Sequence, residues 1–437
     1  MFFYHVRIAL KSLRRNPVLS SLLIGGIAVG IGISTAFVTL RHMYVQDPIP
    51  GGSDRVFYVR LDSWGGQQSY MSDDPESLPD QVTYADARAL LESPIPRRQT
   101  PTFVGAAFLH PATAATRPWQ AEIRLTFNDL FDIFRMPFAY GGPWTEDADA
   151  RAERVAVIDH DTNQKLFGGE NSVGRTIRLE DAEFRVVGVL APWRPPLRYF
   201  EMNRGATGKP EEVYLPFNLV EPMQIATRGN ANNWKPIQPY SFEAMLASER
   251  VWLQYWVELA APGDVDAYGD WIASYVEGQR SLGRFEQTTR YRLSTVPQLI
   301  EEFGLMPAGV RAMSIVALLF LLVCSLNLIG ILLGKFLARA SEVSVRRALG
   351  ASRAQVFWQH LIECELIGLI GGGAGLLLSL GVLAVIRRHM RNGEALRLDS
   401  EMLLFAAVLS LVAGLIAGLY PAWRACRIAP AMQLKVQ

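Results

Sequence analysis

The chain has 437 residues, of which 50% belong to the hydrophobic set and 19% are charged. This composition excludes an intrinsically disordered chain and a small disulfide-stapled secreted domain. Basic and acidic side chains nearly cancel, to a net charge of +1, so the chain has no general attraction for nucleic acid or for acidic partners.

Four stretches without any charged residue are long enough to cross a bilayer as helices. They span residues 18–40, 312–334, 366–386 and 402–423. A helix needs about 20 apolar residues to cross roughly 30 Å of hydrocarbon. The sequence therefore predicts an α-helical membrane protein with four transmembrane helices. A cleaved signal peptide is the alternative for the first stretch, but no small-residue cleavage site follows Leu40.

Lysine and arginine flank these spans unevenly, and such residues are enriched in cytoplasmic segments. Twelve lie before the first span, between the second and third spans, or after the fourth, whereas four lie in the loop 387–401. We therefore predict that both termini and the segment 335–357 are cytoplasmic. The large segment 44–305 and the short loop 387–401 are then external.

Residues 2–15 mix apolar and basic side chains, and Pro17 ends the pattern. We expect residues 1–17 to form an amphipathic helix in the inner membrane interface, with its basic residues near lipid phosphates. A short soluble tail is the alternative.

The external segment 44–305 contains no cysteine, so it folds without disulfides, and it is large enough for one or two hydrophobic cores. Strand patterns cover 55–61, 154–158, 176–179, 183–190, 251–259 and 291–296, and helix patterns cover 84–92 and 264–276. Thr83 and Asp264 are the expected helix caps, and 176–179 with 183–190 is the expected hairpin. A mixed α+β domain results, with a loop-rich insertion at about 191–249. A helical run from Gln298 is expected to lead into the second span (306–334).

The segment 335–357 is predicted to be an elbow between two long helices. Gly350 suits the position after a helix end, and Ser352 with Gln355 has the spacing of a capping box. A helix from Arg353 to Ile386 would measure about 51 Å. Its first turns must project into the cytosol, before the third span (358–386).

Each predicted span carries two glycines four residues apart, a spacing that lets helix backbones approach closely in lipid. The helix-packing candidates are Gly26, Gly30, Gly330, Gly334, Gly371, Gly375, Gly414 and Gly418.

Chemical motifs are missing from the sequence. No segment fits GxxxxGK[ST], and there is no CxxC or HExxH. We therefore predict no catalytic residue, no cofactor and no metal site on this chain. His360 beside Glu363 and Glu365 could form a metal or proton site, but water or a neighbouring helix can satisfy these groups instead. Asp159-His160-Asp161 is expected to be a solvated turn.

Asn327 is the main strongly polar residue deep in the spans. We expect it to form an interhelical hydrogen bond rather than part of a transport path. No hydrophilic channel is evident.

Residues 342–372, EVSVRRALGASRAQVFWQHLIECELIGLIGG, resemble the E-x-G-x-R-R-A-x-G-A segment of the MacB-type (type VII) ABC transporter permeases. This superfamily also includes the FtsX and lipoprotein-releasing subunits. The C-terminal LYPAWRACRIAPAMQLK resembles the family's Y-P-A-x-x-A-x-x-x-x-P-x-x-x-L ending, and 154–190 resembles its periplasmic core domain. The resemblance covers the chain except about 191–249, and Ser344 stands where the family more often has Gly.

The resemblance implies a place in the bacterial inner membrane and a mechanism without enzyme activity on this chain. Two permease chains, identical or similar, would pair, and two ABC ATPase subunits carrying ATP and Mg would dock on the elbow. A periplasmic adaptor is a further candidate partner, beside membrane lipids, and no nucleic acid is expected. The implied coupling residues are Glu342, Arg346, Arg347, Ala348, Leu349, Gly350, Ala351 and Arg353.

Nucleotide-driven motion would then pass through the helices to the periplasmic domains. Export of, or resistance to, peptides or other amphiphiles is the expected function. A lipoprotein-releasing subunit, an FtsX-like activator of a cell-wall hydrolase and a receptor without an ATPase are the alternatives. The substrate and its binding residues are unknown.

Overall fold

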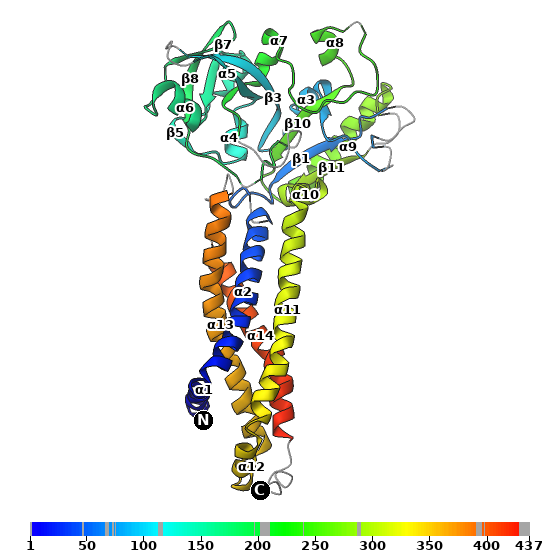
Figure 1. Cartoon of the computed structure of the whole chain (residues 1–437). Coiled ribbons are helices and arrows are strands. Elements are labelled where there is room, and N and C mark those ends of the chain that lie inside the picture. Colours follow the sequence, from blue (N-terminus) through cyan, green and yellow to red (C-terminus); the bar gives the residue numbers. More distant parts are fainter. Residues whose placement is uncertain are drawn as a thin grey trace. The chain divides into compact units, whose positions relative to one another are not determined.

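The apolar stretches form long helices in the computed structural model, which describes residues 2–45, 48–65, 70–71, 74, 76–111, 117–195, 197–201, 210–238, 240–285, 290–389, 396 and 398–427. Among these residues, four helices are long and apolar enough to span a membrane. They are α2 (Pro17–Val45), α11 (Ala308–Leu337), α13 (Arg353–His389) and α14 (Ser400–Cys426). Figure 1 shows them as the long helices of the chain. The fold class predicted from the sequence is confirmed.

The helical unit comprises Met1–Gln46 and Met306–Gln437. Helix α2 packs against α11 and α13, and α14 packs against the same two helices. Their shared core contains Ile27 of α2, Leu328 of α11, Ile367 of α13 and Ala417 of α14. The amphipathic helix α1 (Phe2–Arg15) packs on α13 and α2.

The elbow contains one short helix, α12 (Ala340–Ala348). Gly350 follows it at φ +100°, and its N–H donates to the Arg347 carbonyl while the Ala351 N–H donates to that of Arg346, each at 3.1 Å. This pair of bonds is the glycine stop expected at a helix C-terminus. Ser352 and Gln355 exchange the two capping-box bonds at 3.0 and 3.2 Å and begin α13. Both local predictions for the elbow are confirmed.

The segment Asp47–Leu305 forms a second unit, built on a mixed sheet. The strands run in the order β11-β1-β10-β3-β4-β9-β6-β8-β5. They are β1 (Val56–Leu61), β2 (Val82–Thr83), β3 (Arg98–His110), β4 (Trp119–Thr126), β5 (Phe138–Gly141), β6 (Val155–Ile158), β7 (Thr176–Leu179), β8 (Ala182–Leu190), β9 (Val213–Pro216), β10 (Val251–Glu258) and β11 (Tyr291–Thr295).

Part of this sheet closes into a barrel. Strand β7 pairs with both β3 and β8, so the ring β3-β4-β9-β6-β8-β7 returns to its first strand. The pairs β4–β9 and β6–β8 are parallel, whereas the other pairs in the ring are antiparallel. Closure removes the open edge that a sheet otherwise presents. The core includes Phe103, Ile123, Val186 and Leu215.

Helices lie between the strands of this sheet along the chain, or directly after the last strand (Figure 1). They are α3 (Tyr84–Leu90), α4 (Asp129–Ile133), α5 (Glu146–Ala150), α6 (His160–Phe167), the 3₁₀ turn η1 (Phe217–Leu219), α7 (Val220–Met223), α8 (Phe242–Leu246), α9 (Gly263–Ser281) and α10 (Val296–Glu302). Thr83 caps α3 as predicted, accepting from the Asp86 N–H at 3.0 Å. The predicted hairpin is also confirmed, with β7 antiparallel to β8.

Several predictions for this domain are wrong in detail. Asp264 is not the cap of α9, which begins at Gly263 after Pro262. Asp159 caps α6 through the Thr162 N–H at 2.7 Å, so 159–161 starts a helix rather than a solvated turn. The local sequence allows both outcomes, because Asp favours turns and helix caps alike.

Two longer segments also differ from expectation. The 191–249 segment, predicted to be loop-rich, contributes β9, which pairs parallel to β4 and antiparallel to β6 in the barrel. The helical run predicted from Gln298 does not continue into the second span. Helix α10 ends at Glu302 and α11 begins at Ala308, with Gly304 at φ +56° between them.

Candidate functional site

The elbow helix α12 presents apolar and charged side chains to its surroundings. Val345 of α12 is 52% exposed, and Leu349, directly after the helix, is 84% exposed, which is high for aliphatic side chains. Glu342 and Arg346 form an i,i+4 ion pair at 2.9 Å on the helix surface. An exposed leucine beside a charged pair is the composition expected of a protein contact.

Two of the predicted coupling residues also brace the elbow within the chain. Arg346 Nη1 donates to Gln359 Oε1 of α13 at 3.2 Å. Arg347 Nη1 donates to the Cys426 carbonyl at the end of α14 at 3.4 Å. These contacts fix α12 to two of the long helices. The remaining predicted residues lie at the turn, where Ala348, Gly350 and Arg353 are exposed and Ala351 is half-buried.

Beside the elbow, four buried polar residues and one half-buried arginine form a group that we call the Glu363 cluster. Its members come from α1, α11, the residue before α12, and α13: Ser12, Lys335, Arg339, His360 and Glu363. Lys335 Nζ lies 2.6 Å from Glu363 Oε1, with both side chains at most 3% exposed. The Ser12 hydroxyl donates to Glu363, and Arg339 donates to Ser12. The cluster therefore ties α1, α11 and α13 together.

His360 completes this cluster without a hydrogen bond. Its ring lies against Phe336, with centroids 4.1 Å apart, and its Nδ1 is 4.0 Å from Glu363 Oε2. Neither ring nitrogen has a hydrogen-bond partner. The predicted grouping with Glu365 is not formed, because Glu365 faces α14, where a Cβ on Gly414 would lie 3.0 Å from its Oε2. Within the described ranges, no three His, Cys, Asp or Glu side chains are placed to hold a metal.

The predicted packing glycines differ in their surroundings. A Cβ on Gly30 would lie 2.7 Å from Leu321 of α11, one on Gly371 would lie 2.7 Å from Ile27 of α2, and one on Gly375 would lie 2.9 Å from the Ala28 carbonyl. Gly418 is similarly close to Cys364, whereas Gly26 has ordinary contact with Leu328. Close approach at Gly30, Gly371, Gly375 and Gly418, but not at Gly26, requires a residue without a side chain.

Gly330 and Gly334 have no atom within 4 Å of such a Cβ, so their packing role stays a prediction. Asn327 is exposed on α11 as well. It lies three residues before Gly330, and Gly334 follows four residues later, so the three share one helix face. This face is not covered by the described part of the chain.

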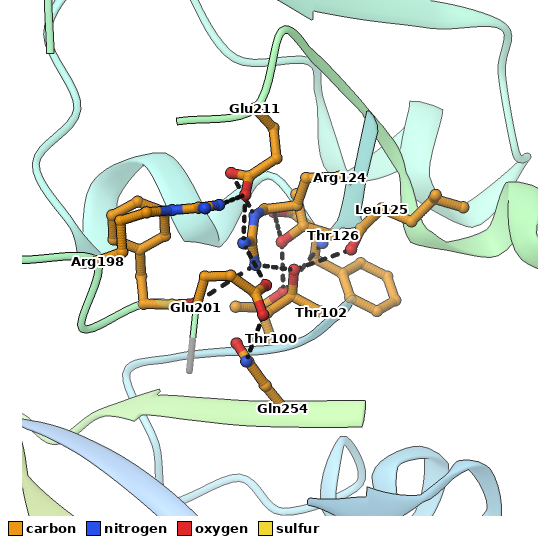
Figure 2. Close-up of polar contacts among 11 residues, drawn as sticks. Thr100, Thr102, Arg124, Leu125, Thr126, Arg198, Glu201, Glu211 and Gln254 are labelled. Atoms are coloured by element: carbon orange, nitrogen blue, oxygen red, sulfur yellow. Dashed lines mark hydrogen bonds and ion pairs between the residues drawn. The ribbon is translucent and has the colours of Figure 1, made fainter. Parts of the chain in front are cut away.

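A second polar group, the Arg124 cluster, lies inside the sheet domain (Figure 2). It comprises Arg124, Arg198, Glu201 and Glu211. Arg124 Nε and Nη2 lie 3.0 Å from the two Glu211 oxygens, and Nη2 lies 2.8 Å from Glu201 Oε2. Arg198 Nη2 donates to Glu211 Oε1 at 2.5 Å. Arg124 and Glu211 are fully buried, so this is a charge-balanced group closed to water.

The charges of the Arg124 cluster oppose the effect of burial. Burial alone would raise the pKa of Glu211, but Arg124 and Arg198 lower it to about 2. Burial raises the pKa of Glu201 despite the same cations, because Glu201 shares Arg124 with Glu211. These ion pairs connect the insertion 191–249 to Arg124 of β4. We therefore interpret the Arg124 cluster as a structural element.

The sequence places His360 near Glu363 but does not predict that Ser12, Lys335 and Arg339 join them. It does not predict the Arg124 cluster, which joins residues 77 and 87 positions apart. Arg124 in the strand Trp119–Thr126 is the available signal, since it stands between Ile123 and Leu125, and an arginine buried between apolar residues needs a partner.

The four apolar helices, the elbow and the large mixed α/β domain between the first and second spans of the sequence define a multi-pass membrane protein of the permease class. Residues 20–275 match the family described as MacB-like periplasmic core domain, and residues 314–430 match the family described as FtsX-like permease C-terminal. The chain belongs to this MacB/FtsX-like family of ABC transporter permeases, and its large domain is periplasmic.

Curated relatives agree with this assignment. The chain is 26% identical over 432 residues to the macrolide export ATP-binding/permease protein MacB of Burkholderia cenocepacia, covering 97% of this chain and 56% of the relative. It is 23% identical to the pyoverdine export ATP-binding/permease protein PvdT of Pseudomonas aeruginosa, covering 99% and 58%. The chain thus spans about half the length of these relatives. The aligned part is their permease portion, without the ATP-binding domain.

A distant solved structure is the periplasmic region of MacB from Actinobacillus actinomycetemcomitans. The match covers 60% of this chain and 99% of the solved chain, at 15% sequence identity and a TM-score of 0.37.

Proposed function

We propose that this chain is the permease component of an ABC exporter, passing ATP-driven motion from a partner ATPase to its periplasmic domain. MacB-like permeases work with an ABC ATPase. The observation that supports this role here is the bracing of the elbow. Helix α12 contacts α13 through Arg346–Gln359 and the end of α14 through Arg347, so displacement of α12 would displace the long helices.

The ATPase would dock on the exposed tip of the elbow. Leu349 supplies an apolar anchor, and Glu342, Arg346 and Arg353 supply charge around it. Interfaces of this kind concentrate their binding energy in a few buried apolar or arginine side chains. ATP and Mg would be held by the ATPase.

The docking proposal is tested by Leu349→Asp, with Leu282→Asp as the control. Leu282 is 75% exposed, similar to Leu349, but it lies in the periplasmic domain. We expect Leu349→Asp to abolish co-purification of the ATPase and stimulation of its ATP hydrolysis, while Leu282→Asp retains both. Equal retention by both variants would place the docking surface elsewhere.

A second permease chain, identical or similar, would pair through the Asn327, Gly330 and Gly334 face of α11. An exposed asparagine in a membrane span is costly unless it finds a hydrogen-bond partner, and small residues beside it allow a second helix to approach. A cysteine replacing Gly334 should form an intermolecular disulfide in membranes, whereas one replacing Ser410, which faces the chain interior, should not. The reverse result would contradict this pairing face.

The proposed orientation places both termini and the elbow in the cytoplasm. A cysteine at Asp181, which is exposed in the periplasmic domain, should react with an impermeant maleimide added to intact spheroplasts. A cysteine at the exposed Ser352 of the elbow should react only after lysis. The opposite pattern would overturn the orientation.

Two relatives are named for macrolide export and for pyoverdine export. We propose an amphiphilic export substrate for this chain, with a periplasmic adaptor as a further partner. Deletion of the gene should increase cellular retention of the exported compound, and the elbow variant Leu349→Asp should reproduce the deletion. Full export by Leu349→Asp cells would contradict ATPase-driven export.

A further inference from the structure

A cavity of about 320 Å³ opens between α1, the elbow and α13, beside the Glu363 cluster. Its wall carries four basic side chains, Lys11 and Arg15 from α1 with Arg339 and Arg346 from the elbow. Two acidic side chains, Glu342 and Glu363, line it as well.

Both carboxylates are already neutralised. Glu363 pairs with Lys335 at 2.6 Å and accepts from Ser12. Glu342 accepts from Arg346 at 2.9 Å and lies 3.8 Å from Arg15. With Lys335 included, five basic side chains face two carboxylates. The cavity therefore carries an excess of positive charge.

Some buried nitrogen atoms in the cavity wall have no hydrogen-bond partner. Arg339 Nη2 and both ring nitrogens of His360 are buried without a hydrogen-bond partner. His360 is 3% exposed and lines the cavity. Buried donors without acceptors are rare in native proteins because each costs the free energy of desolvation. An anion in the cavity would supply the missing acceptors.

The polar cavity adjoins a second hollow whose lining is partly apolar. This hollow of about 850 Å³ shares Arg15, Arg339 and Glu342 with the first and extends to Leu19 of α2 and Ile331 of α11. Both of these apolar residues pack at the edge of the helical core. A ligand that fits both hollows has an anionic head and an apolar tail.

We propose that this cavity binds the phosphate of an anionic membrane phospholipid, with an acyl chain along Leu19 and Ile331. Arginine and lysine form short, charge-assisted hydrogen bonds to phosphate oxygens. Basic pockets between membrane helices on the cytoplasmic side are suited to anionic headgroups. The bound phosphate bridges α1 to the elbow through Lys11 and Arg339. Lipid binding at this site needs no ATPase, so it can be tested independently of the proposed coupling function.

The test is native mass spectrometry of the purified full chain, titrated with dioleoylphosphatidylglycerol or dioleoylphosphatidylcholine. We expect the anionic lipid to be retained and the zwitterionic lipid to be lost. Lys11→Gln and Arg339→Gln should each weaken phosphatidylglycerol binding about tenfold, the scale of one charge-assisted hydrogen bond. Arg424→Gln is the matched control, because Arg424 is exposed at the end of α14, away from the cavity, and should bind like the parent chain.

The Lys11→Gln variant distinguishes loss of lipid binding from loss of the folded structure. Lys11 is exposed and outside the Glu363 cluster, so its variant keeps the helix contacts that Arg339→Gln alters. Equal affinities for all three variants, or equal retention of the two lipids, would overturn the proposal. Displacement of the lipid by inorganic phosphate at the same concentration would also overturn it, since a free anion rather than a lipid would then be the ligand.

Discussion

The Arg124 cluster and the Glu363 cluster are both buried groups of charges, yet their surroundings differ. Two arginines meet two glutamates in the periplasmic cluster, and Thr102 and Gln254 complete its hydrogen bonds. The Glu363 cluster has one ion pair between Lys335 and Glu363, with unpartnered nitrogens on its neighbours, and it borders an open cavity.

The difference indicates how each region works. In the Arg124 cluster both carboxylates pair with arginines and only Arg198 Nε lacks a hydrogen-bond partner, so the group has one stable arrangement and holds the insertion 191–249 to the barrel. A group with unused donors can gain contacts when a ligand or a helix moves, so its stability depends on what it binds. A fixed charge group in the periplasmic domain and an adjustable one beside the elbow would suit the transmitted motion that we propose.

The largest expected effect separates the two clusters directly. Arg124→Met leaves Glu201 and Glu211 buried without their shared cation, and loss of one partner from a buried ion pair typically costs about 3–5 kcal/mol. Chemical denaturation followed by periplasmic tryptophan fluorescence measures this loss. Arg185→Met is the control, because the exposed Arg185–Glu153 pair is worth less than about 1 kcal/mol. Equal stability of the two variants would show that the buried Arg124 ion pairs stabilise the domain no more than an exposed ion pair does.

Lys335→Met should cost less, about 2–3 kcal/mol, because Glu363 keeps the Ser12 hydroxyl and borders a cavity that admits water. Glu363→Gln in the same background should recover part of the loss, since no unpaired carboxylate then remains. A double-mutant cycle on thermal unfolding in detergent measures the coupling. A loss as large as that of Arg124→Met would show that the Glu363 cluster is equally closed.

Asp149 is a buried carboxylate that accepts hydrogen bonds from neutral donors, whereas the carboxylates of the two clusters also pair with arginine or lysine. It accepts from the Asn128 N–H and the Trp144 Nε1–H, and burial raises its pKa to about 7. The folded state therefore holds a proton that the unfolded state releases near pH 4, and stability falls as pH rises from about 4 to 7. Between pH 5 and 8 this loss should be on the order of 2 kcal/mol, and Asp149→Asn should abolish it. An unchanged pH slope in Asp149→Asn would contradict this assignment.

Glu211 should show the opposite dependence. Its pKa of about 2 in the folded protein lies below its ordinary value of 4.5, so its contribution is present above pH 4.5 and is lost as pH falls toward 2.

Asn327→Leu is expected to have the smallest effect. Hydrogen bonds between membrane helices contribute up to about 1–2 kcal/mol, so pairing of permease chains should weaken only slightly in a FRET assay of labelled chains. Gly330→Leu should weaken pairing more, because its side chain would separate the helices. If Asn327→Leu stopped export while pairing and ATP hydrolysis stayed intact, a substrate path through the membrane would replace transmitted motion.

Local signals in the sequence predicted the local structure well. Charge-free runs located the four spans, the spacing of Ser352 and Gln355 located the start of α13, and Gly350 located the end of α12. Each depends on residues within one helix or one turn, where geometry follows directly from chemistry.

Long-range partners could not be predicted in the same way. Ser12 and Glu363 are 351 positions apart, and Glu211 meets Arg124 only because β9 joins the barrel. Val213–Pro216 is too short and too closely surrounded by Pro, Gly and Asn to be distinguished from a loop by its pattern. Such contacts depend on the register of whole elements.

The central claim is that motion at the elbow reaches the periplasmic domain. Pulsed EPR between spin labels at Asp181→Cys in the two chains of a paired permease measures this directly, in a background lacking Cys324, Cys364 and Cys426. With the ATPase present, addition of ATP should change the distance distribution between the labels, and Leu349→Asp should abolish that change. A distribution that stays the same with and without ATP in the parent chain, while export continues, would contradict the account.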